Sequence, residues 1–128
     1  MKLLLDTHAL LWWLSGNTAL SATARDAIAD TANTAYVSAA TAWEIATKYR
    51  IGKLPSAAPI VGRFAEVLRR YNFYELPIAL AHAEMAGSLP GEHRDPFDRM
   101  LIAQAITERM HFVSLDSKAD SFGVARLW

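Results

Sequence analysis

The stretch that decides the fold is Lys2-Leu3-Leu4-Leu5-Asp6-Thr7-His8-Ala9-Leu10-Leu11-Trp12-Trp13-Leu14. Its first four residues form an apolar run without polar alternation, which is typical of a strand buried on both faces of a parallel sheet. Asp6 ends this run, and the residues from Ala9 to Leu14 are too apolar for a surface loop and predict a helix. The segment therefore predicts a strand followed by a helix, with a carboxylate at the junction.

The rest of the chain repeats this alternation of short apolar runs and helical patterns. Further strands are expected over residues 35–37, 73–77, 111–115 and 124–127. Helices are expected over residues 20–30, 39–49, 61–71, 79–88 and 96–109. Strands that alternate with helices predict an α/β sandwich around a mostly parallel sheet.

Large apolar side chains indicate which helix faces are buried. On the helix over residues 39–49, the side expected to face the core carries Ala42, Trp43, Ile45, Ala46 and Tyr49. Trp12 and Trp13 are expected in the core as well, whereas an exposed tryptophan would mark a surface for a partner. His82 lies in a short helical segment, where a structural role is expected.

Length and composition predict a single domain over residues 1–128. Hydrophobic residues make up 52% of the chain, enough for a sizeable core and too many for global disorder. The absence of cysteine excludes a disulfide framework and a thiolate zinc site. The first apolar run is too short for a signal peptide, and no run reaches the length of a membrane span. These features fit a cytoplasmic protein that does not enter the membrane.

The formal net charge is zero, so the molecule as a whole has no electrostatic preference for a polyanion. A nucleic acid would have to be held by local basic residues or by bound cations. The candidates for phosphate or RNA contacts are Lys48, Arg50, Lys53, His93 and Arg94. A solvated surface is the alternative interpretation of these cations.

Four carboxylates fall where an α/β sheet brings side chains together. Asp6 and Asp116 directly follow apolar strands, and ligands of such sheets bind beyond the carboxyl ends of the strands. Glu44 lies on a helix that starts at this edge, and Asp98 lies near the start of another helix. Converging carboxylates repel one another unless they are protonated or surround a divalent cation. Oxygen ligands favour Mg²⁺ or Mn²⁺, which can activate water for displacement at phosphorus.

Three of these carboxylates also have structural interpretations, which the residues alone leave open. Asp6 could cap the first helix, and Asp116 could belong to a turn. Glu44 has Lys48 four residues further on, the spacing of an ordinary surface ion pair. The functional interpretation gains from the joint placement of the carboxylates at strand and helix ends.

The segment Asp95-Pro96-Phe97-Asp98-Arg99 begins the last long helix and has two acidic residues with different expectations. Asp95 suits the N-cap before a proline, with Arg99 as its partner four residues on. Asp98 suits the positive end of the helix dipole. The residues three and four positions after Asp98 are apolar, so a helical ion pair does not explain it. We therefore expect Asp95 to orient the helix start and Asp98 to bind the metal.

Four segments that span nearly the whole chain carry a resemblance to a known family. They are residues 3–12, with Leu5-Asp6-Thr7-His8; residues 37–46, with Trp43-Glu44-Ile45; residues 93–105, with Asp95-Pro96-Phe97-Asp98; and residues 112–116, with Ser114-Leu115-Asp116. In this order the segments resemble PIN-domain ribonucleases, and in particular VapC-like toxins of bacterial type II toxin–antitoxin pairs.

The resemblance implies a PIN-like three-layer sandwich with a central, mostly parallel sheet of four or five strands flanked by helices. It implies a Mg²⁺- or Mn²⁺-dependent endoribonuclease that forms a homodimer and is held inactive by a cognate antitoxin. By position, Asp6, Glu44 and Asp98 match the acidic triad, and Asp116 matches the fourth acidic position. Supporting positions are Thr7, Ser38, Asp95 and Arg99. The first two match small polar residues that line the site.

Two other classes of function remain open from the residues. One is a non-catalytic regulatory or binding module with a PIN-like or receiver-like fold. A receiver-like domain normally has an acidic pair at the end of its first strand, where this chain has Asp6 followed by Thr7. The other is a metal-dependent phosphatase acting on small molecules, which cleavage of RNA and reversal by an antitoxin would separate from the first interpretation.

Overall fold

The computed structural model describes residues 1–91 and 95–128. The element order is β1 (Lys2–Leu5), α1 (Thr7–Ser15), α2 (Ala22–Ala29), β2 (Thr34–Ser38), α3 (Ala39–Arg50), η1 (Pro55–Ala57), α4 (Phe64–Arg70), β3 (Tyr74–Leu76), α5 (Leu80–Ser88), α6 (Pro96–Thr107), β4 (His111–Val113), η2 (Ser117–Phe122) and β5 (Arg126–Leu127), where η marks a 3₁₀ helix. Among the described residues, no helix is long and apolar enough to cross a membrane.

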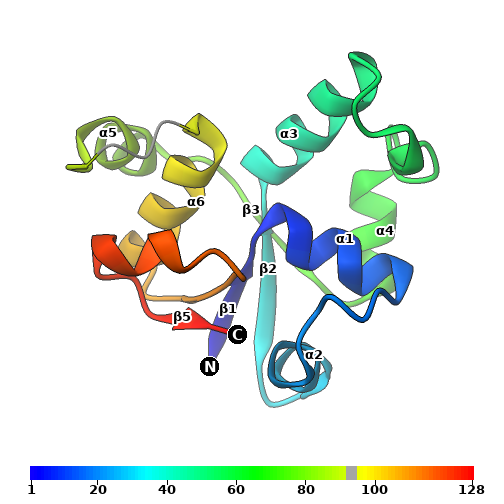
Figure 1. Ribbon diagram of the computed structural model, residues 1–128, viewed down its shortest axis with the longest axis horizontal. Helices are drawn as coiled ribbons and strands as arrows, with labels where there is room; N and C mark the ends of the chain where they lie inside the picture. The colour runs from blue at the N-terminus through cyan, green and yellow to red at the C-terminus, as the bar shows by residue number, and fades with distance from the viewer. Residues whose placement is uncertain (92–94) are drawn as a thin grey trace.

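A five-stranded, all-parallel sheet in the order β3-β2-β1-β4-β5 forms the middle layer (Figure 1). β1 is the central strand, where Leu4 pairs with Tyr36 of β2 and Phe112 of β4. Leu5 pairs with Val113, so the residues that follow these two strands emerge side by side. The expected α/β sandwich with a parallel sheet of four or five strands is confirmed.

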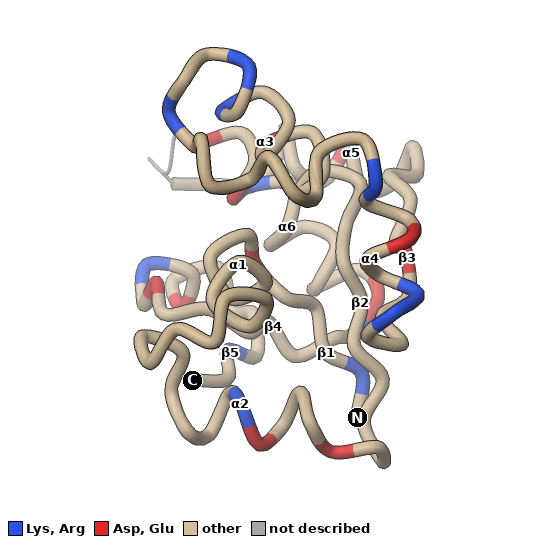
Figure 2. Tube along the Cα trace, turned by 90° about the vertical axis from the view of Figure 1, so that its right-hand side faces the viewer, with Lys and Arg blue, Asp and Glu red and all other residues tan. Residues whose placement is uncertain are grey.

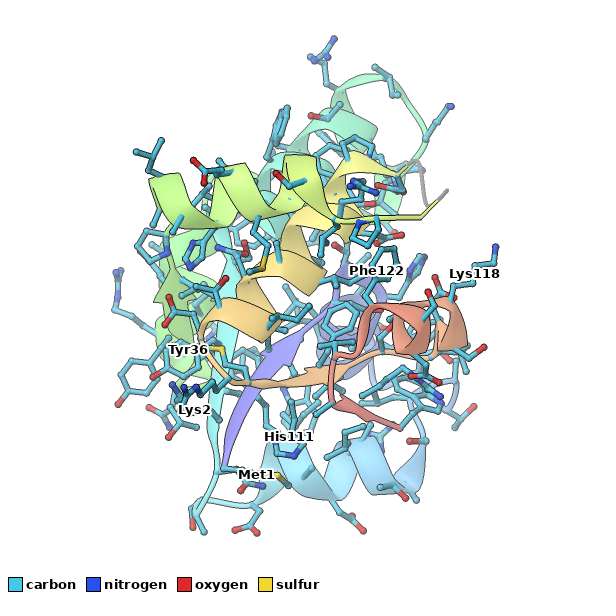
Figure 3. The ribbon with its side chains drawn as sticks, turned by 90° about the vertical axis from the view of Figure 1, so that its left-hand side faces the viewer. Met1, Lys2, Tyr36, His111, Lys118 and Phe122 are labelled. Atoms are coloured by element: carbon cyan, nitrogen blue, oxygen red, sulfur yellow. The ribbon has the colours of Figure 1, made fainter. Side chains whose placement is uncertain are left out.

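Helices cover both faces of the sheet, with α1, α2 and α4 on one side and α5 and α6 on the other (Figure 1). Successive side chains of a strand point to opposite faces. Leu3 and Leu5 accordingly belong to the core on the α1 side, and Leu4 belongs to the core that contains Leu101 of α6. All three leucines of β1 are fully buried, which confirms the prediction of a strand covered on both faces. Figure 3 shows Phe122 on η2, where it packs against the second core.

Helix α3 is rotated relative to the expectation from its apolar residues. Trp43 is 61% exposed and Tyr49 is also exposed, so their expected burial is wrong, and so is that of Ala46. The buried face carries Ile45, as expected, together with Glu44, which lies about 100° around the helix from Trp43. The Trp43 ring makes an edge-to-face contact with Phe97 of α6 at 4.9 Å between ring centroids. Burial of a polar Glu44 in place of an aromatic ring indicates a site beneath α3.

The remaining differences are local. The two tryptophans of α1, Trp12 and Trp13, are half-buried against the first core. The helix expected from residue 61 begins at Phe64, because Gly62 has a φ of 84° that no right-handed helix contains. The 3₁₀ helices η1 and η2 lie in segments for which neither a helix nor a strand was expected.

Candidate metal centre at the carboxyl edge of the sheet

A cavity of about 390 Å³ lies where the carboxyl ends of β1 and β4 meet α1, α3 and α6. Five carboxylates line it: Asp6, Glu44, Asp95, Asp98 and Asp116. The other lining residues are Thr7, His8, Trp12, Lys48 and Leu115. The structure thus brings together all four acidic residues that sequence reasoning placed at this edge, and adds Asp95.

Asp6 has both of the roles that its sequence position left open. Its Oδ1 accepts a hydrogen bond from the backbone N–H of Ala9 at 2.7 Å and so caps α1. The residue is also 8% exposed and lines the cavity. Burial raises the pKa of Asp6, while hydrogen bonds from the Ser114 side chain and the Ala9 N–H and the nearby His8 act in the opposite direction. The charge of Glu44 adds to the increase. This carboxylate is therefore one whose ionised form benefits from a nearby cation.

Ser114 links two of the acidic residues and was missed by sequence reasoning. Its side chain is hydrogen-bonded to the Asp6 carboxylate, and its Oγ accepts the backbone N–H of Asp116 at 3.1 Å. The residue is 1% exposed and directly follows β4, beside the end of β1. The strand expected over residues 111–115 included Ser114, whereas β4 ends at Val113, so the place of Ser114 at the edge of the sheet was not predicted.

Glu44 is not the ordinary surface residue of the alternative interpretation. It is 3% exposed, and its Oε1 accepts a hydrogen bond from Thr7 Oγ1 at 2.6 Å. The expected pair with Lys48 does exist, with the ammonium 2.5 Å from Oε2. The hydrogen bond to Glu44 raises the pKa of Lys48, as do the charges of Glu44, Asp95 and Asp98, while partial burial opposes this. The lysine is therefore a cation inside the acidic cavity.

Asp95 caps α6, as its position before Pro96 predicted. Its Oδ1 accepts hydrogen bonds from the N–H groups of Phe97 at 2.9 Å and Asp98 at 3.3 Å. Arg99 fastens the same helix to the end of α5 by donating to the carbonyl oxygens of Ala86 and Leu89. These contacts hold the first turn of α6, and with it Asp98, against the cavity.

The other predicted site residues lie outside the cavity or outside the described residues. Ser38 does not line the cavity, since its buried hydroxyl caps α3 by accepting the Ala40 N–H and donates to Gln104. Arg50 and Lys53 are exposed in the basic region around the end of α3 (Figure 2). His93 and Arg94 lie outside the described residues.

His8 was not among the predicted site residues. It nevertheless lines the cavity, with its ring 5.5 Å from that of Trp12 between centroids. It occupies the second position of α1, one residue after Thr7. The junction that places Asp6 in the cavity therefore also places a histidine there.

The donor set of the cavity fits a hard divalent cation. Its acidic residues supply carboxylate oxygens, the ligands that Mg²⁺ and Mn²⁺ prefer. Within residues 1–91 and 95–128, no three acidic or histidine side chains already stand close enough together to hold an ion.

The raised pKa of Asp6 predicts a pH-dependent effect of Asp6→Asn on stability without metal. At neutral pH the buried, ionised carboxylate opposes folding, and asparagine keeps an oxygen for the Ala9 N–H. A group whose pKa is raised on folding stabilises the folded protein most at pH values below its pKa in the unfolded chain. This stabilisation is lost as the pH rises through its pKa in the folded protein. Asp6→Asn is therefore expected to increase the free energy of unfolding at pH 7 in EDTA, and the gain should vanish below the ordinary value of 3.8. Urea unfolding between pH 3.5 and about 8 checks this; a gain that does not depend on pH would contradict it.

The cap at Asp95 predicts that two substitutions of this residue differ in their effect on stability. Asp95→Ala is expected to cost about 1 kcal/mol of stability, because the Phe97 and Asp98 N–H groups lose their acceptor. Asp95→Asn keeps an acceptor and should unfold within about 0.5 kcal/mol of the original protein. If Asp95 only orients the helix, Asp95→Asn also keeps most of the ribonuclease activity that the resemblance implies. Loss of activity without loss of stability would show instead that this carboxylate takes part in the chemistry.

The PIN-domain family model matches residues 3–124, and the chain belongs to the PIN-domain family. A 58-residue segment is 40% identical to Ribonuclease VapC16 of Mycobacterium tuberculosis and spans 45% of this chain and 41% of that protein. The VapBC2 structure from Rickettsia felis, bound to a promoter DNA fragment, contains a similar chain with a TM-score of 0.70 and 16% identity, over 95% of this chain and 93% of that one. Mycobacterium tuberculosis VapC20, a toxin that cleaves the sarcin–ricin loop, has a TM-score of 0.62 and 16% identity over 95% of each chain. The resemblance to VapC-like PIN domains that four segments of the sequence indicated is confirmed.

Proposed function

We propose that the protein is the toxin of a type II toxin–antitoxin pair and cleaves RNA phosphodiester bonds with the help of Mg²⁺ or Mn²⁺. The observation that carries this proposal is the convergence of Asp6, Glu44, Asp98 and Asp116 in one cavity of a PIN fold. The partial match to a VapC ribonuclease supports the reaction class. The receiver-like alternative is not supported by this family match, and no observation favours a phosphatase acting on small molecules.

Asp6, Glu44, Asp98 and Asp116 are the residues that would hold the ion. When bound, a divalent cation activates a water molecule and stabilises negative charge on the phosphate and leaving oxygen. Thr7 orients Glu44 through its hydrogen bond to Oε1, and Ser114 does the same for Asp6. Both orienting side chains are buried, so these two carboxylates keep their direction without solvent support.

The chain's own cations provide attraction for the RNA backbone. Because the net charge is zero, this attraction is local, and Lys48, Arg50 and Lys53 at the end of α3 are the candidates that the structure describes. Contacts to phosphate fix the position of a strand and carry little sequence information. Selectivity for a particular RNA sequence therefore comes from other parts of the surface.

An antitoxin is the proposed protein partner. Structures with this fold include the VapBC2 complex of Rickettsia felis and a toxin–antitoxin complex from Klebsiella pneumoniae, the latter with a TM-score of 0.61 and 21% identity over 91% of this chain and 88% of that one. We further propose that the protein is a homodimer and acts in the cytoplasm, where its RNA substrate is found. The dimer and the location both follow from the resemblance to VapC-like toxins.

The deciding experiment is controlled expression in a bacterial host with and without the neighbouring open reading frame. Growth arrest that the neighbour relieves, together with Mg²⁺- or Mn²⁺-dependent cleavage of total RNA by the purified protein, is the expected result. Cleavage that persists in EDTA would reject the metal mechanism. A folded protein that binds RNA without cleaving it would favour a binding module, and hydrolysis of small phosphate esters alone would favour the phosphatase.

A further inference from the structure

The acidic cavity contains a positive charge that belongs to the protein itself. The Lys48 ammonium lies 2.5 Å from Glu44 Oε2, and the charges of Asp95 and Asp98 also act on it. The Lys48 side chain is 37% exposed, whereas that of Glu44 is 4% exposed. The ammonium therefore lies between a buried carboxylate and the solvent-facing part of the cavity.

Both oxygens of Glu44 have partners in this arrangement. Thr7 Oγ1 donates to Oε1 at 2.6 Å, and Lys48 occupies Oε2. An ionised carboxylate with so little exposure needs a compensating charge, because its desolvation cost is large. Lys48 supplies that charge from the next turn of the same helix.

We propose that Lys48 is the resident cation of the metal-free site, and that a divalent ion must displace its ammonium from Glu44 Oε2 in order to bind. This inference rests on the proposed metal-dependent function and adds a positioning residue to it. An ammonium and a divalent ion attract the same oxygen and repel each other, so their occupancies of Glu44 compete. The long, flexible stem of lysine allows the ammonium to leave without moving α3. Thr7 stays bonded to Oε1 and keeps the carboxylate in place during the exchange.

An exposed pair with the same four-residue spacing would not have this effect. Such pairs contribute little, since water stabilises both charges when they separate. Here Glu44 is only 3% exposed, so water stabilises its carboxylate less than it would an exposed one, and release of Lys48 has a cost that the incoming ion must offset. The competition therefore lowers the affinity for metal and protects Glu44 in its absence.

The test is the affinity of purified Lys48→Gln for Mn²⁺, measured by calorimetry and by electron paramagnetic resonance of free Mn²⁺. Binding at least about fivefold tighter than in the original protein is expected. Lys48→Arg retains a cation and should bind Mn²⁺ within about twofold of the original. Lys2→Gln is the matched control, because it removes the same charge from a hydrogen-bonded lysine at the amino end of β1 (Figure 3). The cavity lies beyond the carboxyl end of this strand. In EDTA, Lys48→Gln should also unfold at a lower temperature, since Glu44 loses its compensating charge.

A second measurement uses the original protein and so does not depend on the folding of a variant. In nuclear magnetic resonance spectra, the hydrogen-bonded Lys48 ammonium should give a slowly exchanging ¹⁵Nζ signal, assigned by its loss in Lys48→Arg. Addition of Mg²⁺ is expected to remove this signal as the ammonium is released.

The outcomes separate the inference from the function on which it rests. If the original protein binds Mn²⁺ and folded Lys48→Gln binds it no more tightly, or the ammonium signal survives saturating Mg²⁺, the inference is wrong and the metal site stands. If only Lys48→Gln binds Mn²⁺, Lys48 blocks the site and the inference holds in its strongest form. If neither protein binds Mn²⁺, both proposals fail.

Discussion

Asp98→Asn is expected to reduce metal-dependent RNA cleavage at least about 100-fold while the protein stays folded. Asp98 lines the cavity from the first turn of α6. The other carboxylate that lines the cavity at this end of α6 is that of the cap residue, Asp95. Asparagine keeps the size and one oxygen but loses the charge that balances a divalent ion. The rate of cleavage of a labelled RNA at saturating Mn²⁺ measures the effect.

Asp120→Asn is the matched control for Asp98→Asn. Asp120 lies on η2, outside the cavity, and is held by Arg126 at 2.8 Å. The same loss of charge there should leave cleavage within about twofold, because surface substitutions away from a site have small effects. Full activity of folded Asp98→Asn would reject the assignment of Asp98 as a metal ligand, whereas equal losses in both variants would indicate a general effect of charge.

Leu4→Ala is expected to lower the free energy of unfolding by about 2–5 kcal/mol. Leu4 is fully buried in the central strand and packs in the core that contains Leu101 and Phe112. Truncation removes apolar contacts and leaves a cavity that the neighbouring strands cannot fill, since their register holds them in place. Urea unfolding in EDTA measures the loss without a contribution from bound metal.

Leu80→Ala provides the comparison for Leu4→Ala. Leu80 is 86% exposed at the start of α5, so the same truncation should change stability by no more than about 0.5 kcal/mol. A loss below about 1 kcal/mol for Leu4→Ala would contradict the central position of β1 in the fold.

The parts of the site that were predictable lie at the ends of short apolar strands. The run Leu3-Leu4-Leu5 identifies a buried parallel strand, and such strands share one carboxyl edge. Asp6 and Asp116 could therefore be placed at the same edge from the sequence, and both line the cavity. The cap at Asp95 was equally predictable, because an N-cap depends on neighbouring residues only.

The rotation of α3 shows where local patterns were insufficient. Its sequence offers two overlapping faces that could be buried. The face containing Trp43 has the larger apolar side chains and was therefore expected to face the core. The structure buries Glu44 instead, because Thr7 of α1 and Lys48 satisfy its two oxygens. Such compensation depends on a residue 37 positions away and leaves no periodic signal.

His8 and Ser114 illustrate the same limit within the site. His8 follows a strand whose end at Leu5 was correctly predicted, whereas Ser114 was expected inside a strand over residues 111–115 that in fact ends at Val113. Ser114 becomes important through its bond to Asp6 on the adjacent strand, and His8 through the direction in which α1 leaves the sheet.

The order of apolar runs, caps and strand-end carboxylates is enough to specify a parallel α/β sheet with an acidic edge, since these features depend on side-chain polarity and near neighbours. Tertiary packing decides which face of α3 is buried, which hydroxyls orient Asp6 and Glu44, and that Lys48 lies within the carboxylate cavity. These arrangements join residues from separate strands and helices. Their energies arise from desolvation and hydrogen bonding that exist only after the layers have packed together.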